Sequence, residues 1–276
     1  MIARRLADAD RANLMEFLDS DPLINIQLRE RVSEGRLDDL PSIAVERDGE
    51  LMVVATMTPS VHAAVAGSMT ADDYAEAGSI VARELLRRSV SLRALIAPAR
   101  IVDPLWESLE GRVPTPPVDR RRQPVYVLDA SPPVVSSDVR LGTTDDLAEL
   151  VPACAAMYLE EVGIDPLARD PKWYAQRIRE IVLNERSFVI WRDGRVAFKC
   201  EVAAETEDAV QLMGVWTRPD LRRQGLARLG LTEVIARIGS TGKAVTLFVN
   251  DFNVAAIRLY ESLGFRQIGV NRALIW

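Results

Sequence analysis

The sequence contains one histidine, His62, and two cysteines, Cys154 and Cys200, among 276 residues. A single histidine excludes a histidine-based metal cluster, and because it lies in the first half it leaves the second half without a Ser-His-Asp triad. Two cysteines are too few for a disulfide framework or a zinc site. We therefore expect no metal, reduced thiols and a cytoplasmic location.

Long apolar runs and a strong charge of one sign are also absent. The net charge of −6 provides no basic field for nucleic acid. The first residues, Met1 to Asp8, lack the apolar core of a signal peptide, and no apolar run is long enough to cross a bilayer. With 48% apolar and 27% charged residues the chain is an ordinary globular protein. We expect no nucleic-acid or membrane partner, and a monomer or a dimer.

The two halves of the chain share an order of expected elements: helix, helix, strand, tight turn, strand. Arg47-Asp48-Gly49 in the first half corresponds to Arg192-Asp193-Gly194 in the second, and Leu105–Leu109 corresponds to Leu259–Leu263. Matched order and matched letters favour an ancient duplication. Chance similarity between two α/β units is the alternative.

Proline-rich stretches divide the sequence, and Ser131-Pro132-Pro133 predicts the domain boundary. We place a first domain at 1–130, a linker at 131–137 and a second domain at 138–276. Each is expected to be an α/β (α+β) unit, with a mixed, mostly antiparallel sheet flanked by helices.

A loop in the second domain has the features of an anion site. It joins an expected strand, Val210 to Thr217, to a helix that runs to about Ile238. Gly225 lets the backbone approach a ligand, and the free N–H groups of a helix N-terminus favour an anion such as a pyrophosphate. Arginines add positive charge. A solvated strand-to-helix loop is the alternative for this loop taken alone.

A second motif lies on the next helix: Asn253, Ala256, Tyr260 and Leu263-Gly264-Phe265. With Arg222-x-x-Gly225-x-Ala227, this pattern resembles the GNAT superfamily of N-acetyltransferases. The resemblance covers roughly Asp138 to Trp276 and implies that acetyl-CoA is bound as co-substrate. The nearest resemblance is to two-domain GNAT proteins of the mycothiol synthase type, with a degenerate N-terminal domain.

The resemblance also assigns residues to the acetyl-CoA site. The pyrophosphate is expected on Arg222, Arg223, Gln224, Gly225, Leu226, Ala227 and Arg228. The pantetheine arm is expected along Val215, Trp216 and Thr217, where the strand splays from Leu247 and its neighbours. Asn253 is expected to contact the cofactor arm and to cap its helix.

The implied chemistry needs an oxyanion donor, a general acid and a base. A backbone N–H near Val215 is the expected oxyanion donor. Tyr260, protonated at neutral pH, is the expected general acid, with a packing role as the alternative. Glu201 is the first candidate base, and Glu160 or Glu161 is the other. Lys199 and Glu201 share a strand face, where they pair, line a cleft or face solvent.

The first half lacks the corresponding residues. Trp106 stands in place of Tyr260 and Ala99 in place of Asn253. The stretch after Thr58-Pro59, which holds His62, is interpreted as a degenerate loop without arginines or glycine. We therefore expect no acetyl-CoA site there, and a surface or packing role for His62.

The expected function is transfer of an acetyl group from acetyl-CoA to an amine by direct attack in a ternary complex. The acceptor is a small amine, an amino sugar or a protein N-terminus. The competing class is a non-catalytic acyl-CoA sensor or interaction protein. An aminoacyl-tRNA-dependent transferase also uses paired folds of this kind, but the acidic balance argues against it.

Overall fold

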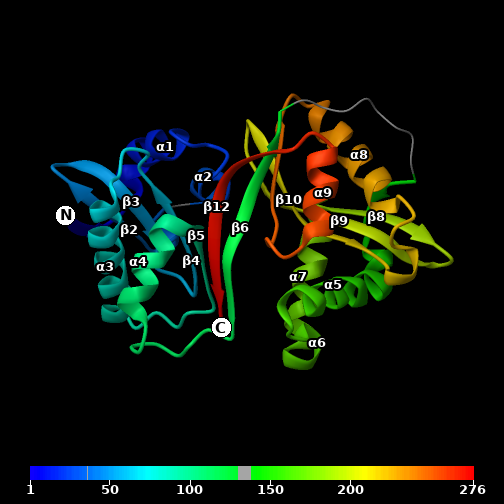
Figure 1. Cartoon of the computed structure of the whole chain (residues 1–276), viewed down its shortest axis with the longest axis horizontal. Coiled ribbons are helices and arrows are strands. Elements are labelled where there is room, and N and C mark those ends of the chain that lie inside the picture. Colours follow the sequence, from blue (N-terminus) through cyan, green and yellow to red (C-terminus); the bar gives the residue numbers. More distant parts are fainter. Residues whose placement is uncertain (36, 130–137) are drawn as a thin grey trace. The chain divides into compact units, whose positions relative to one another are not determined.

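The computed structural model describes residues 1–35, 37–129 and 138–276, so the expected linker at 131–137 lies outside the described residues (Figure 1). The chain forms two compact units. The first consists of Met1–Tyr126, Phe248–Val254 and Gln267–Trp276, and the second of Val127–Leu247 and Ala255–Arg266. Two late segments thus pack with the first unit, and the units do not simply follow the order of the chain.

The order of helices and strands recurs in the two halves, as the sequence repeat predicts. The first half contains β1 (Ile2–Arg5), α1 (Arg11–Asp19), α2 (Ile26–Glu34), β2 (Ser42–Arg47), β3 (Glu50–Thr56), β4 (Ser60–Val65), α3 (Ala71–Arg87), β5 (Ala94–Pro98), α4 (Ala99–Leu109) and β6 (Val118–Leu128). The second half contains β7 (Arg140–Leu141), α5 (Leu147–Val162), α6 (Pro166–Arg169), α7 (Pro171–Leu183), β8 (Ser187–Arg192), β9 (Arg195–Glu205), β10 (Ala209–Thr217), α8 (Leu226–Gly239), β11 (Ala244–Phe248), α9 (Val254–Ser262) and β12 (Arg266–Ile275). Apart from short 3-10 turns, α6 is the element of the second half that has no counterpart in the first.

Each unit is built on a mixed sheet. The strand order is β1-β2-β3-β4-β5-β12-β6 in the first unit and β11-β10-β9-β8-β7 in the second. Strands β4 and β5 pair in parallel, as do β10 and β11, whereas the other registered pairs are antiparallel. The expected α/β class with a mostly antiparallel sheet is therefore confirmed. The last strand, β12, pairs with β5 and completes the sheet of the first unit.

The two Arg-Asp-Gly sequences form the same tight turn between antiparallel strands. Asp48 and Gly49 have φ angles of 52° and 86°, and Asp193 and Gly194 have φ angles of 54° and 71°. Positive φ at both central positions is the geometry of a type I′ hairpin, which suits the twist of the flanking strands. The matched letters of the repeat thus reflect a matched backbone requirement.

Helices cover both faces of each sheet (Figure 1). In the first unit, α3 and α4 share one apolar cluster with the strands, and α1 and α2 share another. In the second unit, α5 and α7 pack with Val196 and Trp216 in one cluster. The opposite face carries α8, where Gly230 lies so close to Phe198 that a Cβ would come within 2.6 Å of the ring.

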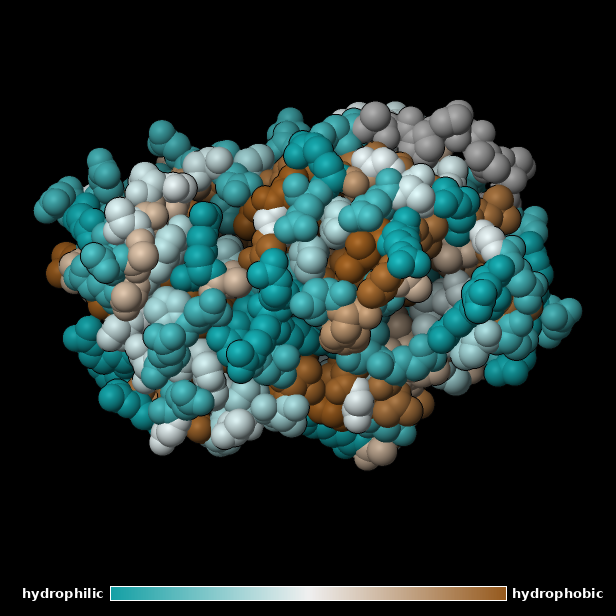
Figure 2. All heavy atoms as spheres, viewed as in Figure 1, coloured by the Kyte–Doolittle hydropathy of each residue, from teal (hydrophilic) through white to brown (hydrophobic). Residues whose placement is uncertain are grey.

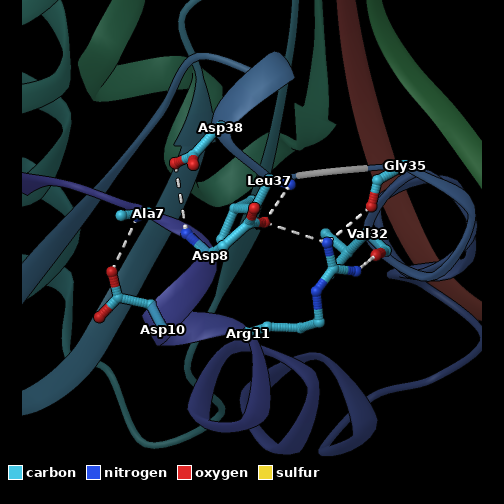
Figure 3. A network of polar contacts seen from close by, with 8 residues as sticks. All are labelled: Ala7, Asp8, Asp10, Arg11, Val32, Gly35, Leu37 and Asp38. Atoms are coloured by element: carbon cyan, nitrogen blue, oxygen red, sulfur yellow. Dashed lines mark hydrogen bonds and ion pairs between the residues drawn. The ribbon is translucent and has the colours of Figure 1, made fainter.

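A polar network joins the start of α1 to the end of α2 (Figure 3). The guanidinium of Arg11 donates to the carbonyl oxygens of Val32 and of Gly35, the latter at 2.6 Å. The carboxylate of Asp8 accepts from Arg11 at 3.2 Å and from the N–H of Leu37 at 2.7 Å. A cation at the C-terminal end of a helix satisfies carbonyls that have no partner within the helix. This network fixes α1 against α2.

The exposed apolar side chains of the second unit include one that the sequence pattern placed wrongly. The apolar residues of this helix in the sequence predict a buried face of Trp173, Ile178, Ile181 and Val182, but Trp173 is 55% exposed, whereas its neighbour Tyr174 is 2% exposed. The buried stripe runs through Tyr174, Ile178 and Val182, which recur every four residues. Trp173 lies about 100° away from this stripe around the helix. Figure 2 shows that polar side chains cover most of the visible surface, with apolar side chains in smaller patches.

In the described part of the chain, no helix is long and apolar enough to cross a membrane.

The interpretation of His62 as a loop residue is wrong. His62 lies in β4 and is buried, and its Nε2 is 3.4 Å from a guanidinium nitrogen of Arg31. The loop that corresponds to the one before α8 is formed instead by residues 66–70, between β4 and α3. The alternation of apolar residues in β4 was overlooked because Thr58-Pro59 resembled the start of a loop. Burial, and then the charge of Arg31, lowers the pKa of His62 to about 3.

This low pKa predicts how stability responds to pH. His62 is neutral in the folded protein but protonates with a pKa of 6.5 when unfolded, so the unfolded state binds more protons below pH 6.5. The contribution of neutral, buried His62 to the unfolding free energy is present above pH 6.5 and is lost as pH falls toward about 3. Between pH 6 and pH 4 the wild type should lose about 1.4 kcal/mol of unfolding free energy per pH unit more than His62→Gln. Urea unfolding across this range measures the difference, and parallel curves would contradict it.

Candidate active site

The end of β10 separates from β11 in the second unit. The two strands pair from Ala209 to Leu212, and no pairing between them is found beyond Leu212 in the described residues. The predicted splay is thus present. On its other side β10 remains paired with β9, with a bulge between Met213 and Trp216 where Gly214 has a φ of 59°. The bulge leaves backbone groups of Gly214 and Val215 out of the regular ladder.

The loop after β10 leads into a helix whose N-terminus has no side-chain cap. Gly225 is the N-cap residue of α8, with a φ of 82°, and the first turn contains no acidic residue. The first helical bond after it runs from Leu229 N–H to the Gly225 carbonyl at 3.0 Å. The N–H groups before Leu229 are those that a helix leaves without an internal partner. They form a site that favours an anion.

The corresponding helix of the first unit is capped by its own residues. Thr70 precedes α3, its hydroxyl accepts from the N–H of Asp73 at 3.3 Å, and its N–H donates to the Asp73 carboxylate at 2.8 Å. The hydrogen bond from the Thr70 N–H, followed by the one from the Arg47 side chain, lowers the pKa of Asp73 to about 2. A carboxylate therefore lies at the start of α3, on the N–H of its N-cap residue, which corresponds to Gly225 of α8. The loop residues differ as well, since residues 66–70 contain no arginine.

The arginines of the second unit's loop are held in different ways. Arg222 donates to the Thr217 carbonyl at 3.0 Å and to Glu160 at 2.6 Å. Glu160 also accepts from the indole N–H of Trp216 at 3.3 Å. Both side chains of the Arg222–Glu160 pair are 43% exposed, so the pair contributes little stability and can exchange for another anion. Arg223 is exposed, with a φ of 63°.

The remaining loop residues bind the backbone or the neighbouring helix. Gln224 donates to the Asp220 carbonyl at 3.1 Å, and Arg228 donates to the Ser262 hydroxyl at 2.5 Å, which connects the start of α8 to the end of α9. Leu226 and Ala227 are half-buried. The hydroxyl of Thr217 is buried and has no hydrogen-bond partner. An unsatisfied buried donor beside the splayed strand fits a polar ligand there.

Tyr260 lies on α9 and is buried. Its ring centroid is 5.9 Å from that of Phe265, and burial, followed by Cys200 and then Glu161, raises the pKa of its hydroxyl. The phenol is therefore protonated at neutral pH. Gly264 has a φ of 95°, and the N–H of Phe265 donates to the Tyr260 carbonyl at 3.1 Å. The Leu-Gly-Phe sequence thus ends the helix in the manner of a left-handed C-cap.

Asn253 immediately precedes α9, in the segment that packs with the first unit. Its N–H donates to the Asn250 carbonyl at 2.9 Å. The other expected site residues lie in the second unit, on the end of β10, the loop, the start of α8 and the middle of α9.

Glu201 lies on β9 in a buried ion pair. Lys199 donates to its carboxylate at 2.6 Å, and the two side chains are 0% and 4% exposed. The Cys154 thiol donates to the same oxygen at 3.1 Å. Burial opposes ionisation, but Lys199 outweighs it and lowers the pKa of Glu201. Of the three arrangements left open by the sequence, the structure shows the pair.

Sequence reasoning did not single out Gly214 or Cys154, nor the contact of Glu160 with Arg222. A glycine inside an otherwise apolar strand indicates a bulge, so Gly214 carried a usable signal. Among residues 1–35, 37–129 and 138–276, no group of three or more His, Cys, Asp or Glu could hold a metal ion.

Comparison with known proteins places this site in a family. The model of a family described as FR47-like protein matches residues 200–274, which include β10, the loop and α9. The [ribosomal protein bS18]-alanine N-acetyltransferase of Escherichia coli K12 is 34% identical over 102 residues, which are 37% of this chain and 66% of the relative. These matches support membership of the GNAT superfamily.

Solved structures extend the GNAT likeness to the fold of the whole chain. A GNAT-family acetyltransferase from Colwellia psychrerythraea covers 100% of both chains, with a TM-score of 0.61 and 13% identity. A tandem GNAT protein from the clavulanic acid biosynthesis pathway covers 99% of this chain and 98% of that one, with a TM-score of 0.57 and 15% identity. At these identities the likeness shows the fold, and it supports a two-domain GNAT protein. The match to the Escherichia coli enzyme spans 66% of that enzyme's length.

The geometry of the bulge predicts that only glycine fits at position 214. A Cβ there would come within 2.9 Å of the Lys199 Nζ and 3.0 Å of a Glu201 oxygen, at a positive φ. Gly194 also has a positive φ, but a Cβ there would meet nothing within 4 Å. Gly194→Ala should cost about 1 kcal/mol of unfolding free energy through backbone strain alone, and Gly214→Ala at least about 2 kcal/mol more. Equal losses in urea unfolding would show that the pair does not constrain the bulge.

Proposed function

We propose that this protein is an N-acetyltransferase that transfers the acetyl group of acetyl-CoA to an amine, with one coenzyme site, in the second unit. The observation that carries the proposal is the uncapped N-terminus of α8, placed directly after the splayed end of β10. The corresponding helix α3 carries its own carboxylate, Asp73, at the same position, which supports a single site.

The residues of the second unit fit the parts of acetyl-CoA. The N–H groups of Gly225 to Arg228 bind the pyrophosphate, and Arg222 and Arg223 contribute charge. The pantetheine arm adds to the open edge of β10 from Val215 to Thr217, where the Thr217 hydroxyl has no partner in the protein.

The reaction proceeds by direct attack in a ternary complex. The neutral amine nitrogen forms a bond with the thioester carbonyl carbon, and the carbonyl electrons move onto the oxygen, where the N–H of Val215 donates to the oxyanion. The C–S bond then breaks, and Tyr260 gives its proton to the departing thiolate. The proton lost by the amine passes to a base, from which Tyr260 is reprotonated. The products are the N-acetylated amine and CoA.

A carboxylate reached through water removes the amine proton. Glu160 and Glu161 at the end of α5 are the candidates for this step. Glu201, the first candidate from the sequence, is the nearest carboxylate to the bulge, and its ion pair with Lys199 supports a positioning role instead.

The acceptor is an amine, and a peptide that begins with alanine is the first one to assay. The matched Escherichia coli relative is named for acetylating an alanine of a ribosomal protein. Thiol release with acetyl-CoA and such a peptide, or with another amine of a panel, tests the enzyme. Acetyl-CoA binding without thiol release from any amine would favour the non-catalytic sensor. We also propose the cytoplasm as its location, since Cys154 and Cys200 are buried free thiols.

The general-acid role predicts a large kinetic effect of Tyr260→Phe. The variant keeps the ring contact with Phe265 but lacks the proton that the thiolate needs. Its kcat should fall about 100-fold or more, while the Kd for acetyl-CoA changes less than about threefold. Tyr74→Phe is the control, because Tyr74 is a buried tyrosine of the first unit whose hydroxyl has no hydrogen-bond partner. An unchanged kcat for Tyr260→Phe would remove this residue from the mechanism.

The pyrophosphate assignment predicts a loss of binding in Arg222→Ala. A charge-assisted contact with phosphate contributes about 1.5–3 kcal/mol, so the Kd for acetyl-CoA should rise about tenfold or more, with a weaker dependence on salt. Arg195→Ala is the control, since Arg195 is an exposed arginine of the same unit on the β8–β9 turn. Isothermal titration calorimetry at two salt concentrations measures both variants. Equal Kd values would contradict the assignment.

A further inference from the structure

The ion pair of Lys199 and Glu201 is the most deeply buried charged group of the second unit and lies directly against the bulge of β10. Besides bonding to Glu201, Lys199 donates to the Gly214 carbonyl at 3.0 Å. The sequence has only three lysines, Lys172, Lys199 and Lys243, and this one is completely buried. The pair is therefore a specific feature of this strand and not part of a charged surface.

Stability alone does not account for the pair. Removing two charges from water is costly, and a buried ion pair is often matched or exceeded in stability by apolar side chains of similar volume. The neighbouring apolar cluster includes Val196 and Ile178, whereas Cys154, Tyr174 and Arg177 act electrostatically on the pair. A pair of charges can polarise a neighbouring backbone group, which an apolar pair cannot do. The backbone group that Lys199 contacts is the Gly214 carbonyl.

The Gly214 carbonyl and the Val215 N–H belong to the same peptide group. The chain has no cis peptide bond in its described part, so this N–H is directed opposite to the carbonyl, away from Lys199. An ammonium that donates to a carbonyl polarises the whole amide and makes its N–H a stronger donor. The Val215 N–H is the group that the proposed mechanism places on the oxyanion.

The two faces of β9 separate the pair from the reacting atoms. Lys199 and Glu201 lie on the face covered by α5, where Cys154 contacts Glu201, whereas Cys200 lies on the opposite face. Tyr260 is near Cys200, since Cys200 contributes to the raised pKa of the Tyr260 hydroxyl. The pair thus acts from behind the strand, through the peptide group, and does not touch the substrate.

We propose that Lys199 and Glu201 are positioning residues that hold the bulge of β10 and polarise the Gly214–Val215 peptide, so that the Val215 N–H is a strong oxyanion donor. Glu201 keeps the ammonium of Lys199 charged and aimed at the Gly214 carbonyl. The Cys154 thiol satisfies the same carboxylate oxygen. Glycine is required at position 214 because any Cβ would displace the ammonium. This inference rests on the proposed function and assigns Glu201 a role other than that of general base.

The test replaces both charges together, so that no uncompensated charge remains in the core. The variant Lys199→Met with Glu201→Leu keeps a similar volume. Infrared difference spectra of acetyl-CoA, with and without ¹³C at the thioester carbonyl, report the strength of hydrogen bonding to that carbonyl when bound to each protein. Arg140→Met is the control, because it breaks a bidentate ion pair with Asp146 in the same unit, away from the bulge.

In the wild type the carbonyl stretch should lie below its value for free acetyl-CoA. In the double variant it should return toward the free value, with a Kd for acetyl-CoA within about threefold of the wild type and a kcat at least about tenfold lower. The pH–rate profile of the double variant should have the same midpoint pH values as the wild type and a lower maximal rate. The Arg140→Met control should keep the wild-type carbonyl frequency even if it melts at a lower temperature.

Two results would overturn the inference while the proposed function stands: a double variant that binds acetyl-CoA with the wild-type carbonyl frequency, or one whose pH–rate profile loses its acidic limb, as removal of a general base requires. A wild type that does not bind acetyl-CoA would instead overturn the proposed function, and the inference with it.

Discussion

The second unit depends on the point where β10 leaves β11. A strand that parts from its neighbour exposes backbone groups that must find partners in water, in the protein or in a ligand. Here the separation comes after Leu212, and the bulge at Gly214 comes immediately after it. The loop then turns through Arg223 and Gly225, both with positive φ, and begins α8 with its N–H groups uncovered. Every proposed contact to the coenzyme depends on this one separation.

The two halves share an order of elements but differ at the N-terminus of one helix. Strand β4 also parts from its parallel neighbour, since its pairing with β5 ends at His62. The difference lies at the N-terminus of the next helix. In the first unit Thr70 and Asp73 bind two N–H groups at the start of α3 and place a negative charge there, whereas Gly225 provides no side-chain cap for α8. A cap of this kind stabilises a helix by about 1 kcal/mol and leaves fewer N–H groups open to an anion.

Much of the fold could be predicted from local patterns. Periodic apolar residues indicated most helices and strands, and the Asp-Gly pairs indicated both hairpins, because these signals depend on neighbours in sequence. The two motifs that resemble GNAT sequences likewise lie within short segments, so the loop and Tyr260 could be singled out from the sequence. The errors concern features set by distant partners. Strand β4 was missed because Thr58-Pro59 just before it indicated a loop. The exposure of Trp173 depended on which face of α7 packs against α5.

The pairing of the last strand and the environment of Glu201 show the same limit. Nothing in Arg266–Ile275 indicates that β12 completes the sheet of the first unit by pairing with β5. The alternation of side chains along β9 placed Lys199 and Glu201 on one face of the strand. Their burial depends on α5, which covers that face. The need for glycine at position 214 depends in turn on the two buried side chains. Spacing in sequence gives the face of a strand, whereas the structure gives the element that covers it.

The central claim is that one helix N-terminus, that of α8, binds the coenzyme and that its counterpart α3 does not. A crystal structure of the whole chain with acetyl-CoA tests it most directly, with the stoichiometry measured by calorimetry on the same sample. The account predicts one acetyl-CoA per chain, with its pyrophosphate on the N–H groups of Gly225 to Arg228 and its thioester beside Val215. A coenzyme bound at Thr70 of α3, or two per chain, would contradict it.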